Sequence, residues 1–352
     1  MPSRLGSRPL PPPTANKYND SYRGWPVGPT KATHVARGTF NDPRPTKDPS
    51  FHFGVDISVD DDHPEPGAPA GHSHRIYAVE SGVVSVPPGN ERAGLDGRKM
   101  QIGHFSYWHA DWVGTVKPGE HVRAGQMIGW TATNEWHVHL SEWKMIDGKR
   151  VWVNPLRPGG KLGPTGDTTK PVIHQIEFYG PAKPKWEFYK GTKRVFSADA
   201  GARLNPNKLQ GLVDMRVWTG DPMPKQGFIK SRPDLQAEQH PYELKIAIRS
   251  SATGKVVFTR KFVNDVLASE KTTFDNHYAP GTIQNLPGKL AVDEFATTPG
   301  GNKYWLRAFD NGKSPYWDTR RMREGGYVVD VTVSDASGNR TSAHRLVQVK
   351  NR

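Results

Sequence analysis

Two histidines, His137 and His139, stand one residue apart inside the segment WHVHLSEWKM. The apolar residues Trp136, Val138 and Leu140 alternate with them, which is the pattern of a β-strand. Side chains two residues apart in a strand point to the same face, with Cα atoms about 7 Å apart at a rise of roughly 3.3 Å per residue. Two imidazoles aimed at one point form half of a catalytic metal site. The spacing alone leaves open whether both bind a metal or one binds it and the other supports it.

A second pair of candidate ligands, His52 and Asp56, lies four residues apart on either side of Gly54. A catalytic zinc takes three protein ligands with nitrogen or oxygen donors and keeps one position open for water. His52, Asp56 and one histidine of the H-x-H pair would complete such a set. The chain has no cysteine, so any metal must bind to histidine and carboxylate groups.

A third motif, Y-W-H, ends at His109 and is preceded by His104 on another strand-like segment. His104 fits a position in a cleft and a structural strand position equally well. His72 and His74 have the same spacing as the H-x-H pair, but they follow a Gly- and Pro-rich stretch. We interpret these two as a solvated surface pair.

In this order, the three motifs resemble the signatures of the lysostaphin-like (LytM-type) zinc metallopeptidases, which are H-x-x-x-D, Y-x-H and H-x-H. The surrounding segments add to the resemblance. FHFGVDI from Phe51 is similar to the family's H-x-G-x-D-I box, and IYAVESGVV from Ile76 is similar to its V-x-A-x-x-x-G-x-V strand. The segment from Val116 to Gly129 is similar to the hairpin that precedes the last motif. The resemblance covers about residues 25–157.

The resemblance implies one zinc ion per chain, bound by His52, Asp56 and His139. It also implies that His109 and His137 are catalytic and flank the metal-bound water, and it leaves open which is the general base and which stabilises the oxyanion. Zinc lowers the pKa of its water to about 7 and polarises a carbonyl, and an imidazole that titrates near neutrality can take the proton. The implied activity is zinc-dependent hydrolysis of peptide bonds in bacterial peptidoglycan.

The last motif departs from the family pattern. The family ends it as H-L-H-F-E, whereas this chain has H-V-H-L-S-E from His137 to Glu142. The aliphatic changes conserve volume and should leave catalysis intact. The segment between Thr131 and Trp136 is shorter than the glycine-rich loop of relatives, so we expect a more open cleft rim, with an effect on substrate choice.

The elements that must position these residues are short strands. With 36 glycines, 31 prolines and 35% hydrophobic residues, the composition favours many turns between strands. Strand patterns recur in the first half at VDISV, RIYAVESGVVSV, KMQIGHFSYWHA, MIGWTA, WHVHLSEWKM and RVWVNP. Helical periodicity is nearly absent. The sequence therefore predicts a mostly β fold with an antiparallel β-sheet metallopeptidase domain in its first half.

A Gly-, Pro- and Thr-rich run, RPGGKLGPTGDTTKP, divides the chain, whose 352 residues suit two domains. Beyond it, runs such as GLVDMRVWTGD, YELKIAIRS and GYVVDVTVSD indicate an antiparallel immunoglobulin-like β-sandwich. The predicted organisation is a flexible Pro-rich leader at 1–22, the zinc peptidase domain at 23–160, a linker at 161–171 and the sandwich at 172–352.

The charge balance of 48 Lys+Arg against 35 Asp+Glu gives +13, which favours association with a polyanion. Acidic cell-wall polymers fit this charge. No zinc-finger spacing, basic helix or aromatic-basic signature accompanies it, so we predict no nucleic-acid partner. No run approaches the roughly 18 consecutive apolar residues that cross a bilayer, so no transmembrane segment is expected. The first thirty residues lack the apolar core of a secretory signal, and we expect export by a segment outside this chain or release by lysis.

The resulting hypothesis is a secreted or cell-envelope zinc endopeptidase that acts on peptidoglycan or another peptide substrate, with a second domain for positioning or wall attachment. One alternative is a non-catalytic wall-binding or regulatory protein that retains the peptidase fold. A polyanion-binding structural protein, in which the sandwich carries the function, is another. The intact set of five imidazole and carboxylate positions argues against the first alternative. Neither the bond cleaved nor the oligomeric state follows from the sequence.

Overall fold

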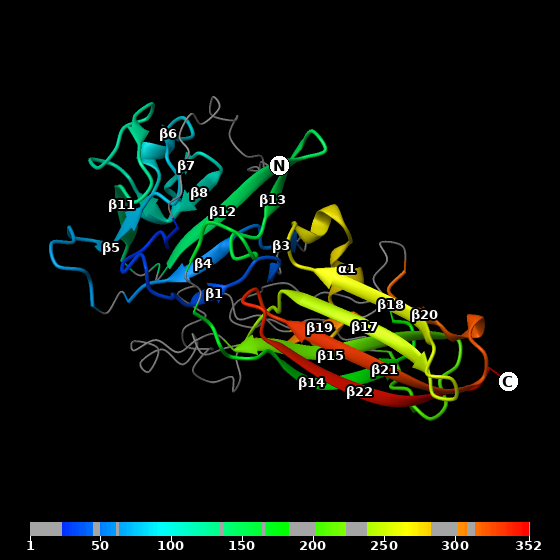
Figure 1. The fold of residues 1–352 in the computed structure, drawn as a ribbon. Helices are drawn as coiled ribbons and strands as arrows, with labels where there is room; N and C mark the ends of the chain where they lie inside the picture. The colour runs from blue at the N-terminus through cyan, green and yellow to red at the C-terminus, as the bar shows by residue number, and fades with distance from the viewer. Residues whose placement is uncertain are drawn as a thin grey trace. The chain divides into compact units, whose positions relative to one another are not determined.

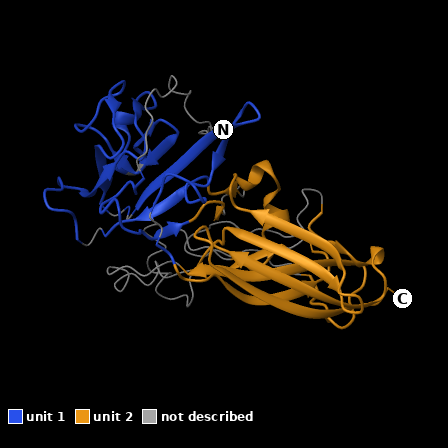
Figure 2. Ribbon diagram, viewed as in Figure 1, with its two compact units in different colours: residues 1–38, 53–167 blue, residues 39–52, 168–352 orange. Residues whose placement is uncertain are grey.

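A computed structural model describes residues 23–44, 50–60, 63–133, 135, 137–163, 166–182, 201–222, 238–282, 302–307 and 314–351. The chain divides into two compact units (Figure 2). Unit 1 comprises residues 1–38 and 53–167, and unit 2 comprises residues 39–52 and 168–352. Segment 39–52 thus groups with the second half of the chain, whereas the sequence prediction places residues 23–160 in one domain.

The larger sheet of unit 1 is antiparallel, and its strands follow the order β1-β4-β12-β8-β7-β6-β10, with β13 paired to β12 (Figure 1). Strand β12 carries the H-x-H pair and lies between β4 and β8. The strand bounds are β1 Ala36–Gly38, β4 Val55–Ser58, β6 Gly82–Ser85, β7 Lys99–Ile102, β8 Phe105–Trp108, β10 His121–Val122, β12 His137–Ile146 and β13 Lys149–Val153.

The smaller sheet of unit 1 has three strands in the order β5-β11-β9. Its strands are β5 His72–Tyr77, β9 Ala110–Asp111 and β11 Met127–Ala132, and two 3-10 turns precede β7, η1 Asn90–Arg92 and η2 Leu95–Gly97. All of β4 and the first seven residues of β12 are buried. Both faces of these strands are therefore shielded from solvent, so the polar side chains on them need partners inside the protein.

The described residues of unit 2 form two larger antiparallel sheets and one two-stranded sheet. One sheet is built around β15 Leu212–Pro222, which pairs with β14 Val172–Tyr179, β16 Glu238–Gln239, β19 Tyr304–Arg307 and β20 Trp317–Asp318. The other has the order β18-β17-β21-β22, with bounds Val256–Val263, Glu243–Ser250, Gly325–Ser334 and Arg340–Val349. The short elements are β2 Pro43–Arg44, β3 Ser50–Phe51, η5 Ala268–Glu270, α1 Phe274–His277 and η6 Thr319–Arg321.

The core of unit 2 follows from period-two alternation. Buried and partly exposed residues alternate along β21, where Val329 and Val331 are fully buried. They belong to one apolar cluster with Met215 and Val217 of β15. Phe51, from the 39–52 segment, belongs to the same cluster and packs against the ring of Phe274 at 5.5 Å. The segment is thus anchored by hydrophobic burial as well as by hydrogen bonds.

The prediction of a mostly β, antiparallel fold is confirmed. The predicted leader, residues 1–22, lies outside the described residues. Among the helices of the described part of the chain, none has the length and apolar character needed to cross a bilayer.

Candidate metal centre

Two histidines and one aspartate from two separate parts of the sequence meet in a buried group. His52, Asp56 and His139 each present a ligand atom, and these atoms all lie within 4.8 Å of one another. Only 3% of His52, 3% of Asp56 and 6% of His139 is exposed. Two imidazoles and a carboxylate, shielded from water and converging on one point, could hold a metal ion.

The pairing of β4 with β12 brings two of these ligands together. Asp56 lies directly opposite His139 in this antiparallel pair, and Trp108 of β8 lies opposite His139 on its other side. Directly opposed side chains point to the same face of a sheet. His139 Nδ1 therefore lies 2.8 Å from Asp56 Oδ1.

The ring of His52 is oriented by its own segment. Its Nδ1 lies 2.9 Å from the carbonyl oxygen of Thr39, to which Nδ1–H donates. A histidine that donates one ring N–H to a carbonyl presents the lone pair of its other nitrogen, here Nε2, to a metal. The residue is buried immediately before Phe53, where the chain enters unit 1.

The chemistry of His139 also fits a cation. Its Nε2 lies 2.8 Å from the hydroxyl of Ser141, and its ring meets the rings of Phe53 and Trp108 edge-on at 4.9 and 5.9 Å. When Nε2–H donates to Ser141, Nδ1 and the Asp56 carboxylate both direct lone pairs toward the same point. Such an arrangement is stabilised by a cation between the two groups.

Gly54 leaves the space that this arrangement needs. A Cβ atom at position 54 would lie 2.6 Å from His139 Nε2, 2.6 Å from the carbonyl oxygen of Leu140 and 2.7 Å from Ser141 Oγ. Real side chains do not approach this closely, so only glycine fits between His52 and Asp56 without moving β12. The donor set, the ring orientations and this close approach together fit a bound metal.

His137 lies beside the group without belonging to it. Its Nε2 is 3.7 Å from Asp56 Oδ1, and its Nδ1–H donates to the backbone carbonyl of Glu135. Burial lowers the pKa of His137 well below its usual value, and nearby His109 and Arg37 lower it further, against the opposing effect of Asp56. The ring is therefore neutral near pH 7, with its lone pair on Nε2.

His109 completes the surroundings of the group. Its ring centroid lies 4.7 Å from that of His137, and its Nδ1 lies 3.4 Å from a carboxylate oxygen of Glu135. Its backbone has a φ of 59°, a left-handed conformation that non-glycine residues rarely adopt and that often marks functional positions. This bend follows β8 directly. The side chain is 24% exposed, so solvent reaches this part of the site.

Glu135 is a site residue that the sequence analysis did not identify. Its carboxylate neighbours His109, while its backbone carbonyl accepts hydrogen bonds from His137 and, at 3.4 Å, from Arg37 Nη1. A carboxylate two residues before an H-x-H pair was the available signal. Tyr107, from the Y-W-H motif, is fully buried and accepts a hydrogen bond from the amide of Val79 at 2.7 Å, which is a structural role.

The remaining histidines of the sequence motifs have other partners. His104 contacts Glu80 through Nδ1 at 3.0 Å and packs on the ring of Trp143 at 4.8 Å. The interpretation of His72 and His74 as a solvated pair was wrong. Both lie on β5, where His72 bonds Asp111 at 2.6 Å with a side chain only 14% exposed, because the pairing of β5 with β11 shields it.

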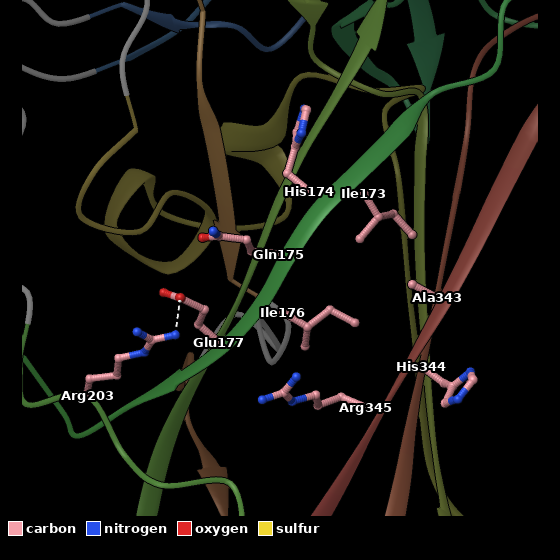
Figure 3. Close-up of a pocket in the computed structure, with 9 residues that line it drawn as sticks. All are labelled: Ile173, His174, Gln175, Ile176, Glu177, Arg203, Ala343, His344 and Arg345. Atoms are coloured by element: carbon pink, nitrogen blue, oxygen red, sulfur yellow. Dashed lines mark hydrogen bonds and ion pairs between the residues drawn. The ribbon is translucent and has the colours of Figure 1, made fainter.

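A separate hollow of about 270 Å³ lies in unit 2, where segments of β14 and β22 run side by side (Figure 3). Arg203 donates to Glu177 at 2.7 Å, and His174 bonds Glu238 at 2.8 Å, so these two basic side chains are each paired with an acid. It is lined by Ile173, His174, Gln175, Ile176, Glu177, Arg203, Ala343, His344 and Arg345.

Comparison of the chain with protein-family models, with curated proteins and with solved structures finds no match. Fold and site geometry therefore define its class. It is a mostly β protein with a buried group of two histidines and one aspartate that could hold a metal ion.

Proposed function

We propose that this chain is a zinc-dependent endopeptidase of the lysostaphin-like (LytM-type) kind, which hydrolyses peptide bonds of bacterial peptidoglycan in the cell envelope or outside the cell. The observation that carries the proposal is the convergence of His52, Asp56 and His139 within 4.8 Å, with the imidazoles of His109 and His137 beside them. Nitrogen and oxygen donors of this kind, three in number, are the ligand set of a catalytic zinc. A zinc ion bound there would supply a Lewis acid for the scissile carbonyl and a water of lowered pKa.

His137 is the proton acceptor in this proposal. Because its Nδ1–H donates to the Glu135 carbonyl, a neutral ring carries its lone pair on Nε2, on the side of Asp56. Burial keeps the ring neutral near pH 7 by lowering its pKa. A neutral imidazole in this orientation can take a proton from an attacking water.

His109 is the hydrogen-bond donor in this proposal. In this proposal both ring nitrogens of His109 carry hydrogen, one directed at the Glu135 carboxylate 3.4 Å from Nδ1 and the other available to a substrate oxygen. Such a group can stabilise negative charge that develops on the carbonyl oxygen of the scissile bond. The left-handed bend at His109 directs the ring toward His137, where the two imidazoles lie 4.7 Å apart.

Zinc content and peptidoglycan digestion test the proposal together. The expected results are one zinc per chain in the wild type, no zinc in Asp56→Ala, and one zinc in a control, Asp60→Ala, whose carboxylate pairs with exposed His63 outside the group. The wild type should release new peptide ends from purified peptidoglycan, detected by mass analysis, and a chelator should abolish this release until zinc is restored.

Two outcomes would overturn the proposal differently. If the wild type binds no zinc, the metal centre itself is refuted. If it binds one zinc and releases no fragments, the chain is instead a non-catalytic wall-binding or regulatory protein with a retained metal site.

A further inference from the structure

The position of the candidate ligand His52 depends on the segment that it ends, residues 39–52. Residues 39–52 group with the β-sandwich half of the chain, and His52 is the last residue of this segment. Phe51, next to it, is buried in the core of unit 2. The placement of His52 therefore depends on how unit 2 holds residues 39–52.

His52 is bound to the start of the segment at three points. Its amide donates to the carbonyl of Asp42 at 2.8 Å, and its carbonyl accepts from the amide of Asn41 at 2.8 Å. Its ring donates to the carbonyl of Thr39 at 2.9 Å. Any shift of residues 39–42 would consequently move both the backbone and the ring of His52.

Asn264, which follows β18, holds this turn from the sandwich side. Its amide group donates to the carbonyl of Phe40 at 2.8 Å, and its side chain is also bonded to that of Asn41. Asn41 has a φ of 67° and is fully buried, and its side-chain oxygen accepts from the amide of Ala268 at 2.7 Å. The turn is thus fixed in a left-handed conformation by hydrogen bonds to residues more than 220 positions away.

Tyr304, on β19, holds the turn at a second point. Its hydroxyl donates to the carboxylate of Asp42 at 3.1 Å. The same carboxylate accepts from the amide and the hydroxyl of Thr39 at 2.6 and 2.9 Å. The amide of His240 donates to the hydroxyl of Thr39 at 3.3 Å. The carbonyl of Thr39 orients the His52 ring. The hydrogen bonds that fix Thr39 therefore also fix the orientation of this candidate ligand.

We propose that Asn264 and Tyr304 are positioning residues for the metal ligand His52. The inference rests on the proposed metal role of His52. Partners that orient a metal-ligating histidine typically contribute about 10- to 100-fold to metal affinity.

The test compares the zinc dissociation constants of the full chain and its variants, measured by competition with a chromophoric chelator. Tyr304→Phe removes one hydroxyl and keeps the buried ring, and Asn264→Ala removes the bonds to the turn. Tyr327→Phe is the matched control, because its hydroxyl bonds the Arg323 carbonyl at 2.7 Å elsewhere in unit 2. The expected result is about 10-fold weaker zinc binding for Tyr304→Phe and weaker still for Asn264→Ala, with no change for Tyr327→Phe.

Urea midpoints of the metal-free proteins separate positioning from general destabilisation. Tyr304→Phe and Tyr327→Phe should show comparable drops in midpoint, since each loses one hydrogen bond. The absorption spectrum of bound Co²⁺ should change in Tyr304→Phe and stay unchanged in Tyr327→Phe. Wild-type zinc affinity in Tyr304→Phe would overturn the inference and leave the proposed function standing, and this holds even if Asn264→Ala fails to fold. A wild type that binds no zinc would overturn both.

Discussion

Gly54 and His139 touch across the sheet, because a Cβ on Gly54 would lie only 2.6 Å from the Nε2 atom of His139. The same Cβ would meet the backbone oxygen of Leu140 at 2.6 Å, an atom that cannot rotate away. The backbone of the H-x-x-x-D motif is thus pressed against the strand that carries the third ligand. Glycine at this position is required by that close approach.

Gly54→Ala should therefore weaken metal binding. Forcing β4 and β12 apart would separate Asp56 from His139, and we expect a loss of zinc affinity of about 10-fold or more. Overpacking of this kind also costs roughly 1–3 kcal/mol of stability. Chelator competition and urea unfolding measure the two effects. Gly163→Ala is the control, since no atom lies within 4 Å of its added Cβ. Equal zinc affinity in both variants would show that the ligands tolerate the displacement.

Glu135→Gln separates the two roles of that residue. The change keeps the backbone carbonyl that accepts from His137 and removes the charge beside His109. If the proposed peptidase activity is correct, peptidoglycan hydrolysis should fall by about 10-fold while zinc content stays at one per chain. Glu120→Gln, an exposed carboxylate that accepts from the Lys117 amide, is the control. An unchanged rate would exclude a part for the Glu135 carboxylate in orienting His109.

Much of the fold was predictable, because alternation of apolar and polar residues over long runs is unambiguous. The strand at Gly325–Ser334 follows that pattern closely from Tyr327 onward. Shorter turns were harder to place. The run from Lys99 was expected as one strand, and the structure breaks it at Gly103, whose φ of 58° ends β7. A single glycine in an apolar run does not reveal its φ angle.

The candidate site was predictable only where spacing carries the signal. Motif spacing predicts His52, Asp56 and one histidine of the H-x-H pair. The family resemblance selects His139, and the structure brings it together with the other two. Glu135 contributes to the site partly through a backbone carbonyl, which any residue type could supply. The grouping of residues 39–52 with unit 2 depends on bonds such as that from Asn264 to Phe40, which no local pattern indicates.

Retention on cell walls should depend on ionic strength. The chain carries a net charge of +13, and acidic wall polymers are the proposed polyanion. Screening shortens the range of this attraction from about 10 Å at 0.1 M salt to about 3 Å at 1 M. We expect the fraction of protein bound to purified walls to fall between 0.1 M and 1 M salt. After the acidic polymers are extracted from the walls, the bound fraction should be low at both salt concentrations. If the bound fraction changes with neither the salt concentration nor the extraction, electrostatic attraction does not contribute to wall binding.

The buried pair His240 and His277 should make unit 2 sensitive to acid. Their Nε2 atoms lie 3.0 Å apart, and burial lowers the pKa of His240 from 6.5 to about 4 and that of His277 well below its usual value. Between pH 6.5 and about 4 the unfolded chain binds protons that the folded chain does not. Stability is therefore fully present above pH 6.5 and falls as the pH drops, by roughly 3 kcal/mol for His240 at about 1.4 kcal/mol per pKa unit.

Urea unfolding of the metal-free protein across this range measures the effect. The difference in unfolding free energy between wild type and His240→Gln should shrink as the pH falls from 6.5 to 4.5, because the variant lacks the group that resists protonation. Groups common to both proteins cancel in this comparison. A difference that stays constant with pH would show that the pair does not titrate in this window.

The pair Glu80 and His104 affects stability in the opposite direction to His240 and His277, because its contribution decreases as the pH rises. The hydrogen bond from His104 Nδ1 to Glu80 raises the pKa of His104, with partial burial acting against it. Bonds from the side chain and amide of His104 also outweigh burial and lower the pKa of Glu80. The stabilisation from charged His104 is thus fully present below pH 6.5 and is lost as the pH rises through the raised folded-state pKa. Its side chain is 46% exposed, so solvent weakens the interaction.

An NMR titration of the His104 ring protons tests this pair directly. The wild-type pKa should lie above 6.5, and Glu80→Gln should lower it, since the amide removes the charge that favours the imidazolium. The ring signals of exposed His63, which pairs with Asp60, serve as an internal reference in both proteins. A His104 pKa that does not move on loss of the Glu80 charge would mean that the two groups do not interact in solution.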